Sequence, residues 1–79
     1  MDSTPMTDAE QAAFATYLRR RIPRPPGAKW HSLYEFTTYS ARVLGQPRLL
    51  HWRGLTRAEA QQVMAACRAQ YPHAVPGQE

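Results

Sequence analysis

The sequence predicts an α+β fold, a small single domain of order α-β-β-α in which two helices cover one face of an antiparallel β-hairpin. Three observations lead to this prediction. A helix-capping signature opens an amphipathic segment near the start of the chain, and a second one does so near its end. Between them, polar and apolar side chains alternate on either side of a glycine turn. All 79 residues, 1–79, are assigned to one domain, because so short a chain has room for one core.

The first helix is predicted over residues 8–22. Thr7 and Glu10 have the spacing of a capping box, in which the hydroxyl accepts from the Glu10 amide and the carboxylate accepts from the Thr7 amide. Pro23, which lacks an amide hydrogen, ends the helix. Apolar side chains recur along the segment at helical spacing: Phe14, Tyr17, Leu18 and Ile22.

Proline dominates the segment that follows. Residues 23–28 carry too few backbone donors for a helix or a strand, so we expect a stiff, extended, polyproline-like connector. Residues 1–6 and 72–79 show no apolar period and are expected to be flexible tails.

The last helix is predicted from Thr56 to the residue before Pro72. Thr56 and Glu59 repeat the capping box, and Leu55 can pack against the first turn. The side chains expected on its buried face are Ala60, Val63, Met64, Cys67 and Tyr71.

The hairpin is predicted from residues 34–44 and 48–53, joined through Gly45 and Gln46. Glycine at the first loop position suits a type II′ turn. Pairing outward from this turn places apolar side chains on one face of the hairpin and polar ones on the other. The expected buried face carries Tyr39, Ala41, Val43, Leu50 and Trp52.

An all-α three-helix fold is the alternative. Ser32 and Glu35 could form a third capping box, and Gly45 followed by Pro47 is a typical helix stop. One helical face would then collect Leu33, Phe36, Ser40, Val43 and Leu44. The hairpin is preferred because residues 34–39 are mostly aromatic or threonine, which favour strands.

Positive charge is concentrated in the middle of the chain. Between Gln11 and Ala58 there are nine basic residues and one carboxylate, Glu35, a net charge of +8. We therefore expect an electropositive surface that attracts an acidic protein surface or a phosphate backbone.

The sequence also bears on compartment and self-association. Cys67 is the only cysteine, which excludes an intramolecular disulfide and favours a reducing compartment. No segment resembles a signal peptide or reaches the ~20 apolar residues that span a bilayer, so we expect a cytoplasmic protein with no membrane partner. Because an isolated hairpin is marginally stable, a homodimer paired edge to edge is a further hypothesis.

No pattern for catalysis, metal binding or cofactor binding is found. His31, His51, Cys67 and His73 lack the spacing of metal ligands, and the central segment offers a single carboxylate for acid–base chemistry. The four glycines stand singly, so no glycine-rich phosphate loop is present. We expect a protein that is not an enzyme and that needs no metal or cofactor.

The remaining function is binding. Our leading hypothesis is a small non-enzymatic protein that binds a larger protein or nucleoprotein assembly stoichiometrically, as an accessory factor or inhibitor, through an electropositive face. Direct nucleic-acid binding by the arginine-rich surface is the alternative. The candidate contact residues form two groups along the chain, the first Arg19, Arg20, Arg21 and Arg24, the second Trp30, Arg42, His51 and Arg53.

Overall fold

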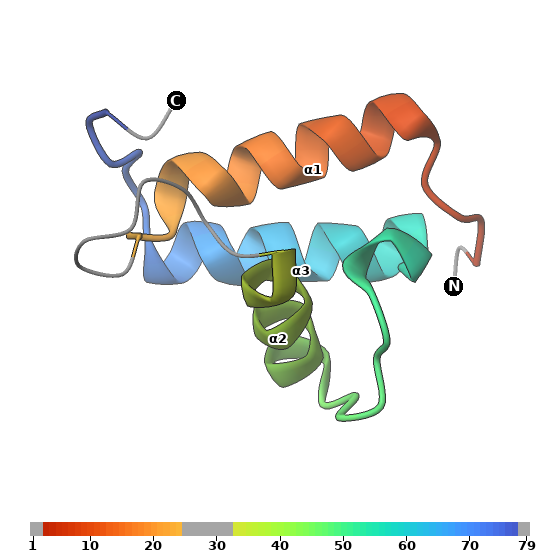
Figure 1. Ribbon diagram of the computed structural model, residues 1–79. Helices are drawn as coiled ribbons and strands as arrows, with labels where there is room; N and C mark the ends of the chain where they lie inside the picture. Colours follow the sequence, from red (N-terminus) through yellow and green to blue (C-terminus); the bar gives the residue numbers. More distant parts are fainter. Residues whose placement is uncertain (1–2, 25–32, 78–79) are drawn as a thin grey trace.

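A computed structural model describes residues 3–24 and 33–77, and it is all-helical over these ranges (Figure 1). Helix α1 spans Asp8–Arg21, α2 spans Leu33–Leu44 and α3 spans Arg57–Gln70, with a short 3-10 turn, η1, at Trp52–Gly54. The described residues contain no strand, and their one isolated β-bridge pairs Pro5 with Thr56. None of the described helices is long and apolar enough to cross a membrane.

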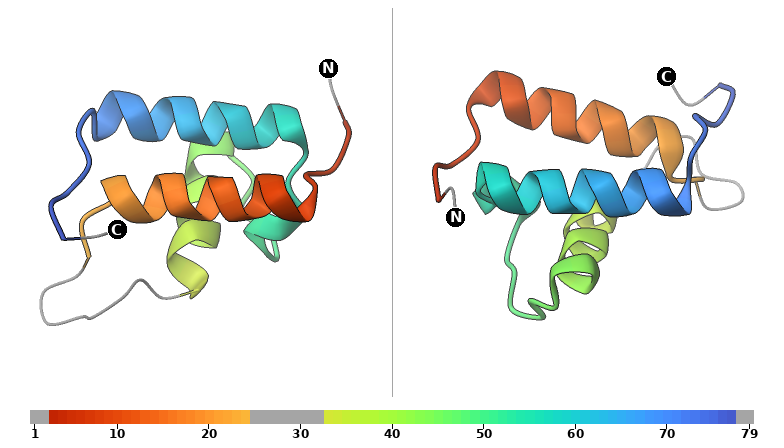
Figure 2. Two further views of the ribbon diagram at one scale, coloured as in Figure 1. Left: turned by 90° about the horizontal axis from the view of Figure 1, so that it is seen from above. Right: turned by 180° about the vertical axis from the view of Figure 1, so that it is seen from behind.

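Helices α1 and α3 lie side by side and run in the same direction, and α2 crosses the pair from one side (Figures 1 and 2). At their amino-terminal end, the Arg57 amide donates to the Thr4 carbonyl (2.8 Å). At their carboxy-terminal end, Arg21 Nη1 donates to the Tyr71 carbonyl (3.0 Å). The Val75 amide donates to the Arg20 carbonyl at this same end (2.7 Å). The parallel arrangement therefore gathers the two helix starts at one end of the molecule and the two helix ends at the other.

The predicted outer helices and their capping boxes are confirmed. In the first box the Glu10 amide donates to Thr7 Oγ1 (3.2 Å), and the Thr7 amide donates back to Glu10 Oε1 (2.9 Å). Thr56 and Glu59 make the same reciprocal pair at 3.2 and 3.0 Å. These bonds satisfy amides that the first turn of a helix leaves unpaired, so local sequence alone determines where both helices begin.

The core forms where the three helices meet the η1 turn. Phe14 stacks on Trp52 with ring centroids 5.3 Å apart, and Phe36 meets the same indole edge-on at 6.5 Å. The indole is thus held between α1 and α2. The buried hydrophobic residues are Met6, Phe14, Leu18, Ile22, Phe36, Trp52, Leu55, Ala60, Val63 and Cys67.

The predicted β-hairpin is wrong. Residues 34–44 belong to α2 and residues 48–53 form no strand, so the all-α alternative describes the fold. A helix turns Phe36, Ser40 and Val43 to one side, whereas a strand would point Val43 away from the other two. Phe36 and Ser40 are buried and Val43 packs against the core. Burying one large apolar side chain is worth ~1.5–3 kcal/mol, which outweighs the few tenths per residue of strand preference in this segment.

Gly45 ends α2 instead of turning a hairpin. Its φ of 65° is left-handed, and the Gln46 amide donates back to the Ala41 carbonyl (2.9 Å), the bond of a Schellman motif. The Ser32 side of the third predicted capping box lies outside the described residues, as do residues 25–28 of the connector. Because the described residues contain no strand, two copies of the chain cannot pair through the edges of a hairpin there. Homodimer formation by another surface stays a prediction.

Two leucines five residues apart test this fold. Leu55 is fully buried and Leu50 is 93% exposed, whereas the hairpin would have buried Leu50. We expect Leu55→Ala to lower the free energy of unfolding by about 2–5 kcal/mol, because it leaves a cavity in the core. We expect Leu50→Ala to change it by less than about 0.5 kcal/mol. Urea denaturation followed by circular dichroism measures both, and a large loss in Leu50→Ala would contradict the helical fold.

Candidate functional site

The predicted contact residues fall in two places, the loop between α2 and α3 and the carboxy-terminal end of α1. His51 and Arg53 lie in the loop, and Arg42 lies in the last turn of α2, just before it. Trp30 lies outside the described residues. The other predicted contact residues are at the helix end: Arg19, Arg20, Arg21 and Arg24.

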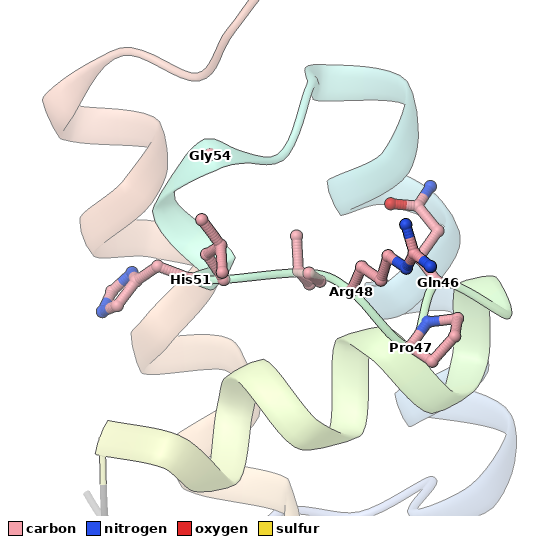
Figure 3. A pocket seen from close by; sticks show the side chains of 7 residues that line it. Gln46, Pro47, Arg48, His51 and Gly54 are labelled. Carbon is pink, nitrogen blue, oxygen red and sulfur yellow. The ribbon is translucent and has the colours of Figure 1, made fainter.

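We call residues 46–54 the loop surface, and within it residues 46–51 and Gly54 line a shallow hollow of about 710 Å³ (Figure 3). Gln46, Pro47 and Arg48 lie at one end of this hollow and His51 lies at the other (Figure 3). The two leucines between these ends face different surroundings. Leu49 packs against the core, whereas Leu50 stands 93% exposed. The loop surface thus presents an exposed leucine, Leu50, between the guanidinium group of Arg48 and the imidazole of His51.

The loop is held in place from both sides. At its start, Gln46 Nε2 donates to Glu59 Oε2 on α3 (2.6 Å). At its end, the buried Trp52 amide donates to Thr37 Oγ1 on α2 (3.1 Å). Two bonds within the loop add to these, from the Leu49 amide to the Gln46 carbonyl and from the Gly54 amide to the His51 carbonyl, both 3.1 Å. Leu50 is therefore exposed on an anchored segment.

The His51 ring and the Arg53 guanidinium are both positioned by Trp52. His51 Nδ1 accepts from the Arg53 amide (3.1 Å) and caps the η1 turn, and its ring lies 5.6 Å from the indole. The Arg53 guanidinium lies over the indole ring, 5.3 Å from its centroid. This cation–π contact orients the charge while leaving the side chain exposed.

No residue of the loop surface is itself acidic, and the nearest carboxylate with a hydrogen bond to it is Glu59 of α3, which accepts from Gln46 at the start of the loop. The residues from Gln46 to Ala58 include no carboxylate. Among residues 3–24 and 33–77, the ion pair formed is between Arg57 Nε and Glu10 Oε2 (2.8 Å). It lies at the start of α1 and not on the loop. The cations of the loop surface, Arg48 and Arg53, are both exposed to solvent.

A second cationic group, which we call the basic end, lies where α1 and α3 finish. It comprises Arg19, Arg20, Arg21, Arg24 and Arg68. Arg68, in the last turn of α3, was not predicted as a contact residue because only the parallel packing of the helices brings it to this end. A lone arginine on an exposed helical face gives no signal of its own in the sequence.

Two arginines of the basic end contact the segment that follows α3. The Arg21 guanidinium lies 4.6 Å from the centre of the Tyr17 ring and donates to the Tyr71 carbonyl. Arg24 Nη2 donates to the Gly77 carbonyl (3.1 Å). Together they tie α1 to the segment after α3, so Arg21 and Arg24 have structural contacts in addition to being candidate contact residues.

The described side chains offer little reactive chemistry. No three histidine, cysteine or acidic side chains among them lie close enough to hold a metal ion. Burial raises the pKa of the Cys67 thiol, which keeps it protonated at neutral pH, where it is a poor nucleophile. Comparison with known proteins finds no matching family model, no matching curated protein and no matching solved structure.

Acid should weaken the anchor at the start of the loop. The Thr56 amide and the Gln46 side chain, which both donate to the Glu59 carboxylate, lower its pKa from the usual 4.5. A carboxyl whose pKa is lower in the folded state stabilises the fold above its unfolded pKa, and this contribution is lost as the pH falls through the folded value. We therefore expect the melting temperature to drop below pH 4.5, and to drop less steeply in Glu59→Gln. Thermal melts from pH 7 to pH 2.5 measure this, and equal slopes for the two proteins would contradict it.

Proposed function

We propose that this protein is a non-enzymatic binding protein that docks stoichiometrically on a larger protein or nucleoprotein assembly, as an accessory factor or inhibitor. The loop surface is the proposed contact, and the partner surface is acidic with an apolar recess. The observation that carries the proposal is Leu50, a 93% exposed leucine on an anchored loop between cationic side chains.

Leu50 has the properties of an interface anchor. Folding gains nothing from this side chain, yet burying a leucine fully is worth ~1.5–3 kcal/mol, which becomes available when a partner covers it. Because the loop is tied to α2 and α3 by side-chain hydrogen bonds, a partner does not have to order it first. Preorganisation of this kind lowers the free-energy cost of association.

The charges around Leu50 define the partner. Protein interfaces commonly surround an apolar centre with a polar rim in which arginine is enriched. Arg48 and Arg53 supply that rim, and their exposed positive charge favours an acidic partner and speeds encounter with it. A standard interface buries ~800 Å² on each partner, more than one loop offers, so the contact should extend to Arg42 at the end of α2.

Capture of a partner by paired variants tests this proposal. The bait is the full chain, the extract comes from cells of the source organism, and it is treated with nuclease. We expect a partner protein whose affinity falls about 30-fold for Leu50→Asp, the effect of losing a ~2 kcal/mol anchor. We expect Arg48→Gln/Arg53→Gln to slow association and to weaken its salt dependence. Binding of purified partner is measured by biolayer interferometry.

The control variant is Arg20→Gln/Arg68→Gln, which removes the same charge from the other end of the molecule. It should keep the partner's affinity for the loop surface. A partner that binds wild type, Leu50→Asp and Arg48→Gln/Arg53→Gln with equal affinity would overturn the proposal. Recovery of no partner protein from the nuclease-treated extract would also overturn it.

A further inference from the structure

The basic end joins side chains that are remote in sequence. Arg20 lies in the last turn of α1 and Arg68 lies in the last turn of α3. Because α1 and α3 run in the same direction, these turns lie at one end of the molecule, on the left in Figure 1. Both side chains are exposed, and Arg20 borders a shallow hollow that it shares with Thr16 and Ala74.

The acidic residues of α1 and α3 are at the opposite end of these two helices. Asp8 and Glu10 lie in the first turn of α1, and Glu59 lies in the first turn of α3. A helix of 14 residues is about 21 Å long at ~1.5 Å per residue. That length exceeds the Debye length of ~8 Å at physiological ionic strength. These carboxylates therefore do little to neutralise the basic end.

The helix dipoles reduce the charge of the basic end but do not cancel it. Each helix terminus contributes roughly −0.5 of an elementary charge, so two parallel helices contribute roughly −1. Five arginines stand against this: Arg19, Arg20, Arg21, Arg24 and Arg68. The charge of the five guanidinium groups exceeds that of the dipoles, and the hydrogen bonds of Arg21 and Arg24 to backbone carbonyls leave their charge unchanged.

The chemistry of this end suits phosphate more than bases. Guanidinium groups donate paired hydrogen bonds to phosphate oxygens. Binding to single strands relies in addition on exposed aromatic rings that stack on bases. The two tyrosines of the basic end, Tyr17 and Tyr71, are only partly exposed, and the Arg21 guanidinium lies over the Tyr17 ring.

We propose that the basic end binds the phosphate backbone of duplex nucleic acid, without reading its sequence, through Arg20 and Arg68. This site is separate from the loop surface and goes beyond the function proposed for it. Together the two sites give a contact to protein and a contact to nucleic acid at different places on one small molecule, as docking on a nucleoprotein assembly requires.

Salt dependence of duplex binding tests this inference. Fluorescence anisotropy with a labelled 20-base-pair DNA of random sequence gives the affinity from 50 to 200 mM salt. Each lost contact to a duplex phosphate lowers the slope of log affinity against log salt by ~0.9. Arg20→Gln/Arg68→Gln should therefore lower the slope by about 1.8. Over this fourfold range of salt, the affinity of wild type should fall about 12-fold more than that of the variant.

The matched control is Arg48→Gln/Arg53→Gln, which carries the same net charge and should keep the wild-type slope. Equal losses in both variants would show that only total charge matters and would overturn the site. So would the absence of duplex binding at 50 mM salt. Tighter binding to poly-glutamate than to the duplex would instead assign the basic end to an acidic protein. Because this assay uses DNA alone, its failure leaves the partner contact at Leu50 standing.

Discussion

The position of Trp52 is the constraint on which the rest of the structure depends. Its ring stacks on Phe14, and Phe36 closes the edge of the indole, so one side chain joins the loop to α1 and α2. Among the described residues the indole Nε1 has no hydrogen-bond partner, although the ring is buried. An unsatisfied buried donor costs ~1–3 kcal/mol, and the burial and stacking of the large ring offset that cost. The helices pack around this residue.

Trp52 is buried in the core, whereas the residues on either side of it in the sequence are exposed. Leu49 packs against the core and Trp52 is buried, and the two residues between them, Leu50 and His51, face solvent. The interaction that stabilises the fold also creates the loop surface. The basic end has a different origin, because it arises from the parallel packing of α1 and α3. One small core thus separates two electropositive surfaces, one with an apolar centre and one without.

Local chemistry explains why some of the fold could be read from the sequence and some could not. The capping boxes at Thr7 and Thr56 act within four residues, so the starts of α1 and α3 were predictable. Strand preference at Thr37 and Tyr39 is equally local and was misleading, because tertiary burial overrode it. The Thr37 hydroxyl accepts a hydrogen bond from the Trp52 amide, and Tyr39 Oη donates to Gln70 of α3 (3.0 Å). Neither partner can be inferred from neighbouring residues.

The sequence by itself determined the two outer helices, their apolar faces and the excess of positive charge, since each follows from short-range spacing or from composition. Tertiary structure alone decided that residues 33–44 are helical, that Leu50 is exposed and that Arg68 joins the arginines of α1. Those outcomes depend on which surfaces bury one another, and the energy of burying a face is a property of the whole packed chain. A single segment does not contain that information.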